Sequence, residues 1–270
     1  MALRPAPVDT GVVFHRIDRN VTFNANLGSV MDTAFATTVG TERGRIRTVE
    51  HLLASLSALC IDNVKIEVEG PDIPIMDGSA IEIISLIDKA GIKKQGKKMP
   101  YIKILKPIVY EDGHASVALY PYEGRKVSFR LFFKNHFLGE QKLSVDITHG
   151  TFFKDVAPAR TFGFVKDIEY FRTHGLAKGG SLQNAVMFSD TAVVNETGLR
   201  FKDECVRHKI LDLVGDFSLL GLPIEGHIVA DKSGHTTNIK FLSTVLAATE
   251  CWQVVTDEVT VPAAFSFSYS

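Results

Sequence analysis

One short segment constrains the fold of this chain more than any other: Arg207-His208-Lys209-Ile210-Leu211-Asp212-Leu213-Val214-Gly215-Asp216. On a helix, His208, Asp212 and Asp216 are each four residues apart, so they line one face. The apolar residues take a roughly opposite stripe, which predicts a helix that stops at Gly221 and Pro223. A His and an Asp one turn apart can bind one divalent metal ion. The alternative is a solvated helix face with a weak pair worth about 0.3 kcal/mol.

A third ligand for such a site is available in Thr48-Val49-Glu50-His51. Thr48 is expected to cap a helix that runs to about Leu59, with Glu50 and His51 in its first turn and away from its apolar face. The helix dipole favours a glutamate there without any function. Together with His208 and Asp212, these residues predict a zinc site of two His and one carboxylate with a spare glutamate. That set is typical of a metal-dependent hydrolase.

Composition restricts the class of protein. A length of 270 residues allows one large domain or two ordinary ones, and 45% hydrophobic with 23% charged residues predicts a packed core. A net charge of −1 argues against bulk nucleic-acid binding. Three cysteines without CxxC spacing predict neither a disulfide framework nor a thiolate zinc site, and they suit a reducing cytoplasm. No segment reaches the ~20 apolar residues of a membrane span.

The chain divides at a basic linker, residues 91–99. Before it, Ser79 and Glu82 form a capping box that predicts a helix to about Ala90. After it, strands are expected over 102–109, 115–119 and 127–133, and a last helix over 237–249. Aligning His51 with His208 places a helix, a turn and a strand in register in both halves. This similarity is either chance or the sign of two related α+β units with the site between them.

Two further places have both a structural and a chemical interpretation. His235 follows Ser233-Gly234 and is either a polar loop residue near a helix start or a protonated imidazole that stabilises an oxyanion and then protonates a leaving nitrogen. Asp216 would hold that imidazole charged, and Lys209 would add positive potential. Residues 178–181 are either a plain turn, the simpler interpretation, or a backbone nest for a phosphate.

Several motifs, spread over nearly the whole chain, resemble one enzyme family. They are Thr48-Val49-Glu50-His51-Leu52, Ile73-Pro74-Ile75-Met76-Asp77-Gly78-Ser79, Ala159-Arg160-Thr161-Phe162-Gly163-Phe164, Gly179-Gly180-Ser181, Asn195-Glu196-Thr197-Gly198-Leu199-Arg200-Phe201, the segment 207–216, and Ser233-Gly234-His235. This set is similar to the UDP-3-O-acyl-N-acetylglucosamine deacetylases, the zinc amidases at the committed step of lipid A synthesis.

The resemblance implies an α+β fold of two related two-layer sandwich domains. The N-terminal domain would take residues 1–97 and the C-terminal domain residues 98–270, with their helical layers packed face to face and the active site between them. The resemblance also implies one Zn²⁺ bound by His51, His208 and Asp212. Iron as Fe²⁺ could replace zinc at such a site.

The same resemblance implies a role for each acid–base residue. Glu50 would be the general base, and His235, with Asp216 as its partner, would be the cationic general acid. Thr161 would donate a hydrogen bond to the tetrahedral oxyanion, and Lys209 would bind in the substrate site. A hydrophobic insert near residues 162–188 would pass the acyl chain, which gives the expected substrate-binding residues Phe162, Phe164, Gly180 and Ser181, with Phe133 or a neighbour on uracil.

The implied reaction is hydrolysis of the N-acetyl group of UDP-3-O-acyl-N-acetylglucosamine to UDP-3-O-acyl-glucosamine and acetate. The expected protein is a cytoplasmic monomer with no nucleic-acid partner and transient contact with the membrane surface. Because family members begin about 30 residues earlier, the chain is expected to lack the first strands, which would leave a sheet edge unpaired. Two alternatives stay open: a truncated form that binds zinc or UDP-sugar without turnover, and a zinc amidase for another sugar.

Overall fold

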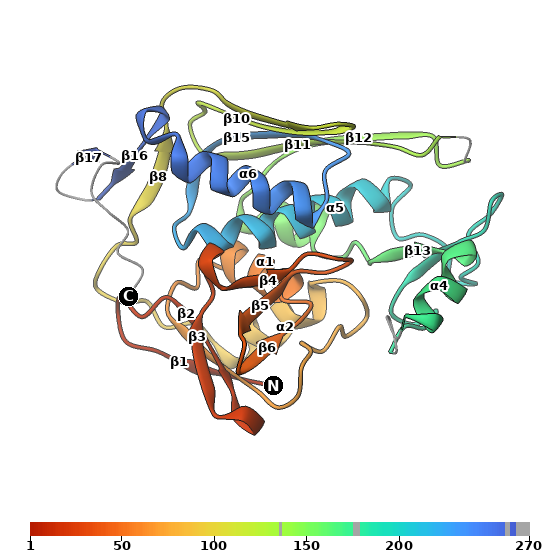
Figure 1. Ribbon diagram of the computed structural model, residues 1–270, viewed down its shortest axis with the longest axis horizontal. Coiled ribbons are helices and arrows are strands. Elements are labelled where there is room, and N and C mark those ends of the chain that lie inside the picture. Colours follow the sequence, from red (N-terminus) through yellow and green to blue (C-terminus); the bar gives the residue numbers. More distant parts are fainter. Residues whose placement is uncertain (135–136, 175–178, 257–259, 263–270) are drawn as a thin grey trace.

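The computed structural model describes residues 1–134, 137–174, 179–256 and 260–262 of the chain (Figure 1). It is a mixed α+β structure with several sheets, and the described residues contain six α-helices. The bounds of these helices are α1 Glu50–Ala58, α2 Ile81–Ala90, α3 His149–Thr151, α4 Ile168–Thr173, α5 Glu204–Phe217 and α6 His235–Ala247.

The largest sheet has eight strands, in the order β12-β11-β15-β8-β16-β17, with β10 and β9 continuing from β15. Its central strand β15 alternates buried and partly buried residues, which is the period of a strand with one face on a core. In Figure 1, α5 and α6 lie against one face of this sheet. Its strands are β8 Tyr101–Ile104, β9 Ile108–Asp112, β10 Ala115–Tyr120, β11 Arg125–Phe132, β12 Glu140–Asp146, β15 Ile224–Asp231, β16 Trp252–Val255 and β17 Thr260–Pro262.

Three smaller sheets complete the described structure. The first has the order β1-β7-β2-β3, the second β4-β5-β6, and the third pairs β13 with β14 in parallel. Figure 1 shows the first two on the far side of α1 from the large sheet, and β13 with α4 at one end of the molecule. The strands are β1 Ala2–Pro5, β2 Val12–Arg16, β3 Val21–Asn24, β4 Val30–Asp32, β5 Thr38–Thr41, β6 Gly44–Ile46, β7 Val64–Val68, β13 Phe162–Phe164 and β14 Val186–Phe188.

Helix α5 is the centre of the molecule, because it packs against α1 on one side and α6 on another. All of its residues except Arg207 and Lys209 are buried. Its apolar residues join those of α1, α6 and the sheets in one hydrophobic cluster. A helix buried over most of its surface fixes the relative position of the buried side chains that it carries, which is the requirement for a site assembled from several elements.

The predicted helices all form, but two predicted caps are wrong. Thr48 has a φ of 60° and lies before the N-cap position, and the N-cap residue Val49 makes no side-chain cap hydrogen bond. The N-cap of α2 is Ala80, and Ser79 instead accepts a hydrogen bond from the Ile81 N–H at 3.2 Å. Both segments enter their helices from loops held by tertiary contacts, so the local cap signals were not decisive.

The strand expected over 102–109 is two strands, β8 and β9, separated at residues 105–107. Pro107 lies in this break, where it cannot donate to a ladder. Strand β12 was not predicted, and it forms by antiparallel pairing with β11. Residues 91–99 form neither helix nor strand.

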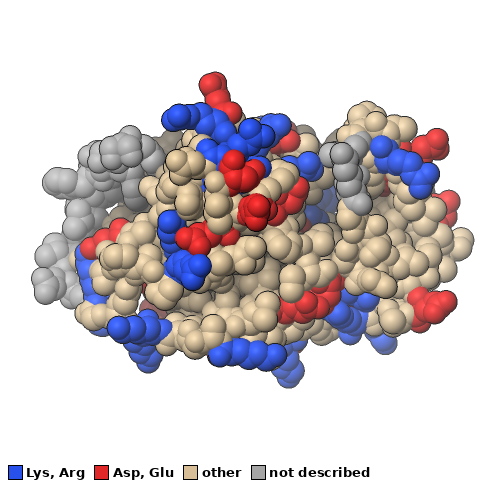
Figure 2. Space-filling view, turned by 90° about the horizontal axis from the view of Figure 1, so that it is seen from below, with Lys and Arg blue, Asp and Glu red and all other residues tan. Residues whose placement is uncertain are grey.

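Charge is distributed without large regions of one sign on the face drawn in Figure 2, where acidic and basic side chains are interspersed. Within the described ranges, no helix combines the length and the apolar character needed to cross a membrane.

Candidate active site

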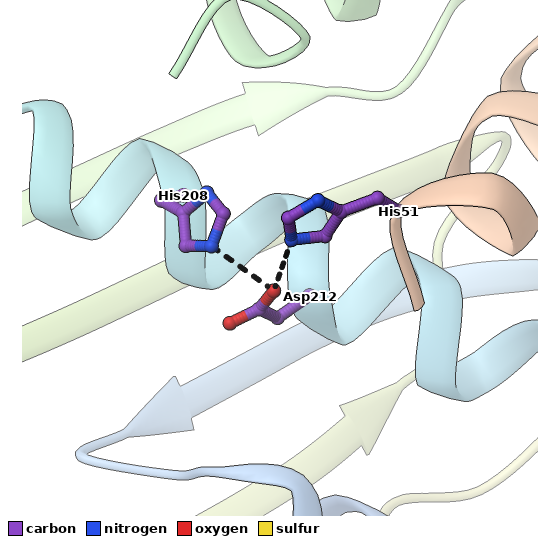
Figure 3. A group of neighbouring side chains, drawn as sticks. All are labelled: His51, His208 and Asp212. Carbon is purple, nitrogen blue, oxygen red and sulfur yellow. Dashed lines mark ion pairs between the residues drawn. The ribbon is translucent and has the colours of Figure 1, made fainter. Parts of the chain in front are cut away.

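Three candidate ligand side chains converge from two helices that pack against each other (Figure 3). His51 comes from the first turn of α1, and His208 and Asp212 come from successive turns of α5. The Nε2 atoms of His51 and His208 lie 3.6 Å and 3.3 Å from Asp212 Oδ1. One ligand atom of each residue lies within 4.8 Å of the others, so the predicted cluster forms.

The face of α5 that carries these residues is buried, which excludes the solvated-face interpretation. His51, His208 and Asp212 are only 4%, 2% and 3% exposed. The two imidazole rings meet edge to face with centroids 5.0 Å apart. Burying this many polar groups is costly unless they bind one another or an ion, so the cluster needs a chemical reason.

The protonation states in this cluster fit a bound metal ion. The His208 Nδ1–H donates to the Ala159 carbonyl at 3.0 Å, which leaves Nε2 as the free lone pair. Burial lowers the pKa of His208 to about 4, so this imidazole is neutral at pH 7. Burial alone raises the pKa of the Asp212 carboxyl, but His208 and Lys209 outweigh it and hold that pKa well below its ordinary value. Neutral imidazoles and an ionised carboxylate are the forms that bind zinc.

The distances between the candidate ligand atoms also fit a bound metal ion. Ligands about 2 Å from a tetrahedral ion are about 3.3 Å from one another. The observed 3.3 Å and 3.6 Å between ligand atoms match that separation. They are long for hydrogen bonds between the same groups. His51, His208 and Asp212 therefore fit Zn²⁺ in donor type and distance, and His208 and Asp212 also fit it in protonation.

Glu50 lies beside the ligand cluster, at the start of α1, and is 3% exposed. The Thr37 backbone N–H donates to its Oε2 at 3.1 Å, and its Oε1 lies 3.9 Å from His235 Nε2. Burial raises the pKa of the Glu50 carboxyl above its ordinary value, while His235 and His51 act in the opposite direction. A buried carboxylate with a raised pKa beside a candidate metal site has the properties of a general base.

His235 is the first residue of α6 and is 7% exposed, so it is not a loop residue. Its Nδ1 lies 2.9 Å from Asp216 Oδ2, and its Nε2 faces Glu50 and Asp212 at 3.9 Å. Burial alone lowers the pKa of His235, but Asp216, and then Glu50 and Asp212, raise it to about 9. The imidazole is therefore cationic at pH 7, as the sequence predicted from Asp216.

Lys209 lies at the edge of the same cluster. Its Nζ lies 2.6 Å from Asp212 Oδ2 and 6.0 Å from the Phe162 ring centroid. Burial lowers the pKa of this partly buried ammonium, but Asp212 outweighs that effect and raises the pKa. Lys209 thus pairs with the candidate metal ligand Asp212, a contact that the sequence interpretation did not include.

Aromatic side chains extend from His208 toward the insert. The Phe162 ring centroid lies 6.3 Å from that of His208, and Phe164 and Phe188 continue the cluster at 6.3 Å and 6.2 Å from Phe162. Phe133 packs on the same group, 6.1 Å from Phe162 and 5.9 Å from Phe164. An apolar surface therefore begins next to the ligand cluster.

The remaining predicted residues lie around this surface. The Thr161 backbone N–H donates to the Gly78 carbonyl at 2.7 Å, and its carbonyl accepts from the Val186 N–H at 2.8 Å. Gly180 and Ser181 are exposed, and the Ser181 N–H donates to Asn184 Oδ1 at 2.8 Å. That amide is already used inside a turn, which favours the turn over a phosphate nest. Residue 178 lies outside the described residues.

Sequence reasoning missed the groups that hold the acid–base residues. The Thr37 hydroxyl donates to Asp216 Oδ1 at 2.6 Å, and Asn238 Nδ2 donates to Asp216 Oδ2 at 2.8 Å. Asn238 stands three residues after His235, a helical spacing that could have indicated it. Thr37 carries no local signal, because its contacts are with residues on α1, α5 and α6.

Sequence reasoning also missed a buried ion pair near the candidate ligands, between Arg160 and Glu204. Arg160 and Glu204 are 5% and 1% exposed, and Arg160 donates to the carboxylate from its backbone N–H at 3.0 Å and its Nε at 2.9 Å. The Arg200 N–H donates to the same carboxylate at 2.7 Å. These bonds attach the segment around Ala159, whose carbonyl orients His208, to the start of α5.

The sequence model of the family described as LpxC, UDP-3-O-acyl N-acetylglycosamine deacetylase, matches residues 1–247, which is most of the chain and includes every residue of the cluster. The chain belongs to the LpxC family. The resemblance inferred from the motifs is thereby confirmed.

Curated LpxC relatives match over almost the full chain. A UDP-3-O-acyl-N-acetylglucosamine deacetylase from Thermodesulfovibrio yellowstonii is 50% identical over 93% of this chain and 86% of its own length. Proteins of the same name from Acidithiobacillus ferrooxidans and Pasteurella multocida are 44% and 46% identical, over 99% and 97% of this chain and 89% and 88% of their lengths. Such identity over most of each chain agrees with the family assignment.

Proposed function

We propose that this chain removes the N-acetyl group from UDP-3-O-acyl-N-acetylglucosamine by metal-dependent hydrolysis, giving UDP-3-O-acyl-glucosamine and acetate in lipid A biosynthesis. Membership of the LpxC family supports the substrate and the reaction. One structural observation carries the mechanism: a carboxylate with a raised pKa and an imidazole with a raised pKa lie next to each other, 3.9 Å apart, beside the buried ligand cluster. Such a pair is suited to remove a proton at one step and to return one at the next.

His51, His208 and Asp212 would hold Zn²⁺, or Fe²⁺ in its place. When bound, the metal supplies a Lewis acid that polarises the amide carbonyl and lowers the pKa of a water molecule to about 7. The Ala159 carbonyl keeps the His208 Nε2 lone pair available for it, and Lys209 keeps Asp212 ionised.

Glu50 would take the proton from the attacking water as the water oxygen bonds to the carbonyl carbon. His235 would stabilise the negative charge that develops on the carbonyl oxygen, helped by a hydrogen bond from Thr161. His235 would then give its Nε2 proton to the nitrogen as the carbon–nitrogen bond breaks, releasing acetate and the free amine. Asp216 would hold the opposite ring nitrogen and keep the imidazole cationic until that transfer.

The substrate would lie with its acyl chain along the aromatic residues that begin next to His208. Phe162 and Phe164 would contact that chain, Phe133 would face the uracil end, and Gly180 and Ser181 would border the passage from the turn beyond β13. Lys209 would add positive charge beside the sugar. The proximity of Phe162 to both His208 and Lys209 supports this placement.

The architecture proposed to serve this reaction is a pair of related two-layer domains, residues 1–97 and 98–270, with helices between the sheets and the active site at their contact. The packing of α1 on α5 supports that arrangement. Location in the cytoplasm, a monomeric state and transient membrane-surface contact remain predictions for this chain.

The test measures acetate release from substrate labelled in the acetyl group, together with metal content. We expect release that stops when a chelator removes the metal and returns when Zn²⁺ is restored. Glu50→Gln should bind metal normally and lose most activity. One equivalent of bound zinc with no acetate released by the unsubstituted chain would instead support the alternative, a binder without turnover. Release from an acetylated sugar lacking the 3-O-acyl chain, at an equal rate, would favour another sugar as substrate.

A further inference from the structure

Thr37 is the residue at which the two halves of the acid–base machinery meet. It lies directly before β5, in the smaller three-stranded sheet, and is fully buried. Its backbone N–H donates to Glu50 Oε2 at 3.1 Å. Its hydroxyl donates to Asp216 Oδ1 at 2.6 Å and lies 3.2 Å from His235 Nδ1. One residue therefore contacts the carboxylate on α1, the carboxylate on α5 and the imidazole on α6.

The hydroxyl has a defined task at Asp216. An ionised carboxylate only accepts, so the single O–H of Thr37 must point at Oδ1. The other oxygen, Oδ2, accepts from His235 Nδ1 at 2.9 Å and from Asn238 at 2.8 Å. Because Asp216 is fully buried, each of its oxygens needs a donor within the protein. Without the Thr37 hydroxyl, Oδ1 would lose its donor and the carboxylate would be oriented through Oδ2 alone.

The backbone of Thr37 ties the same segment to α1. Besides its N–H bond to Glu50, its carbonyl accepts from the Val49 N–H at 3.3 Å, at the N-cap of α1. The position of Glu50 and the orientation of Asp216 are therefore set by one short stretch of chain. The Glu50 and His235 groups that this stretch aligns are 3.9 Å apart.

We infer that Thr37 is a positioning residue that aligns the base Glu50 with the acid pair His235–Asp216. This inference rests on the proposed hydrolysis, because alignment matters only if both groups act on one substrate. The hydroxyl acts on orientation and contacts none of the metal ligands, so its loss should leave metal binding intact. Misplacement of a catalytic group by about 1 Å costs up to about 100-fold in rate.

Three variants of the full chain with Zn²⁺ test the inference. Thr37→Val keeps the shape and removes the hydroxyl, Thr37→Ser keeps the hydroxyl, and Thr38→Val is a control at the buried neighbour. We expect kcat to fall about 10- to 100-fold in Thr37→Val, with KM and zinc content within twofold of the parent chain. Thr37→Ser should retain most of kcat, and Thr38→Val should match the parent.

A kcat of Thr37→Val within threefold of the parent would overturn the inference. So would equal losses in Thr37→Val and Thr37→Ser, since these would assign the effect to packing of the methyl group. A measurement that needs no turnover separates this inference from the proposed function. The NMR resonance of the His235 Nδ1 proton should move in Thr37→Val and stay in place in Thr37→Ser and Thr38→Val. An unmoved resonance in Thr37→Val would also overturn it.

Discussion

Gly215 offers the sharpest test of how the site is assembled. It lies in the middle of α5, where helix propensity alone predicts that Gly215→Ala stabilises the protein by about 1 kcal/mol. The tertiary structure reverses that expectation. A Cβ at position 215 would lie 2.1 Å from the Glu50 carbonyl oxygen and 2.9 Å from the Glu50 Cα. At Gly215, therefore, the backbone of α5 lies directly against the backbone at the start of α1.

The size of the effect follows from these distances. Ordinary van der Waals contact begins at 3.4 Å, so the start of α1 must move by roughly 1.3 Å to admit the methyl group. Glu50 and His51 would move with it, away from His208 and Asp212. Overpacking of this kind costs about 1–3 kcal/mol. A displacement of about 1 Å at reacting groups costs about 100-fold in rate, and misoriented ligands weaken metal binding about 10- to 100-fold.

The assay compares Gly215→Ala with Gly150→Ala, a control in the exposed helix α3, where a Cβ would meet no atom within 4 Å. The free energy of unfolding comes from urea titration, zinc affinity from competition with a chromophoric chelator, and kcat/KM from acetate release. Gly215→Ala should lower the free energy of unfolding, the zinc affinity and kcat/KM, and Gly150→Ala should lower none of them. A Gly215→Ala protein with parental zinc affinity and kcat/KM would refute the reasoning, whatever its stability.

Two further predictions concern protons and buried charge. The pH profile of activity should be bell-shaped. Activity should rise as Glu50 loses its proton, at a pKa that burial raises above its ordinary value. It should fall as His235 loses its proton, near its pKa of about 9. The acid limb should be absent from the residual activity of Glu50→Gln, and identical profiles for the two proteins would contradict the role of Glu50. Glu204→Gln should lower the free energy of unfolding in urea by about 3–5 kcal/mol, because it leaves the Arg160 guanidinium buried without its partner. The matched change Glu140→Gln, in an exposed pair, should cost less than about 1 kcal/mol, and equal losses would show that burial does not set the difference.

Much of the site could be predicted from the sequence because its information is local. His208, Asp212 and Asp216 follow the spacing of helix turns, and the motif at Thr48-Val49-Glu50-His51 supplied the remaining candidate ligand and the candidate base. The helices themselves follow from apolar periodicity, and all of them form within a few residues of their expected bounds. The family could be named because seven motifs stand in one order along the chain, a pattern that needs no coordinates.

The errors share one physical cause, which is that tertiary contacts override local signals. Thr48 has the chemistry of a cap, yet its backbone adopts a positive φ and the helix begins without a side-chain cap. Strand β12 forms by pairing with β11, and the local sequence of β12 alone did not predict a strand. For residues 178–181 the sequence left a turn and a phosphate nest open, and the hydrogen bond from the Ser181 N–H to Asn184 Oδ1 favours the turn.

The sequence by itself determined which residues could carry the chemistry and which helices hold them, since spacing along a helix is a property of a few consecutive residues. Only the tertiary structure decided that the polar face of α5 is buried. This burial depends on the packing of α1 against α5, which is possible because Gly215 has no side chain at the contact. That packing also brings Thr37, far away along the chain, to Asp216. It sets the raised pKa values of Glu50 and His235, because solvent exclusion and opposed charges exist only after the elements have assembled.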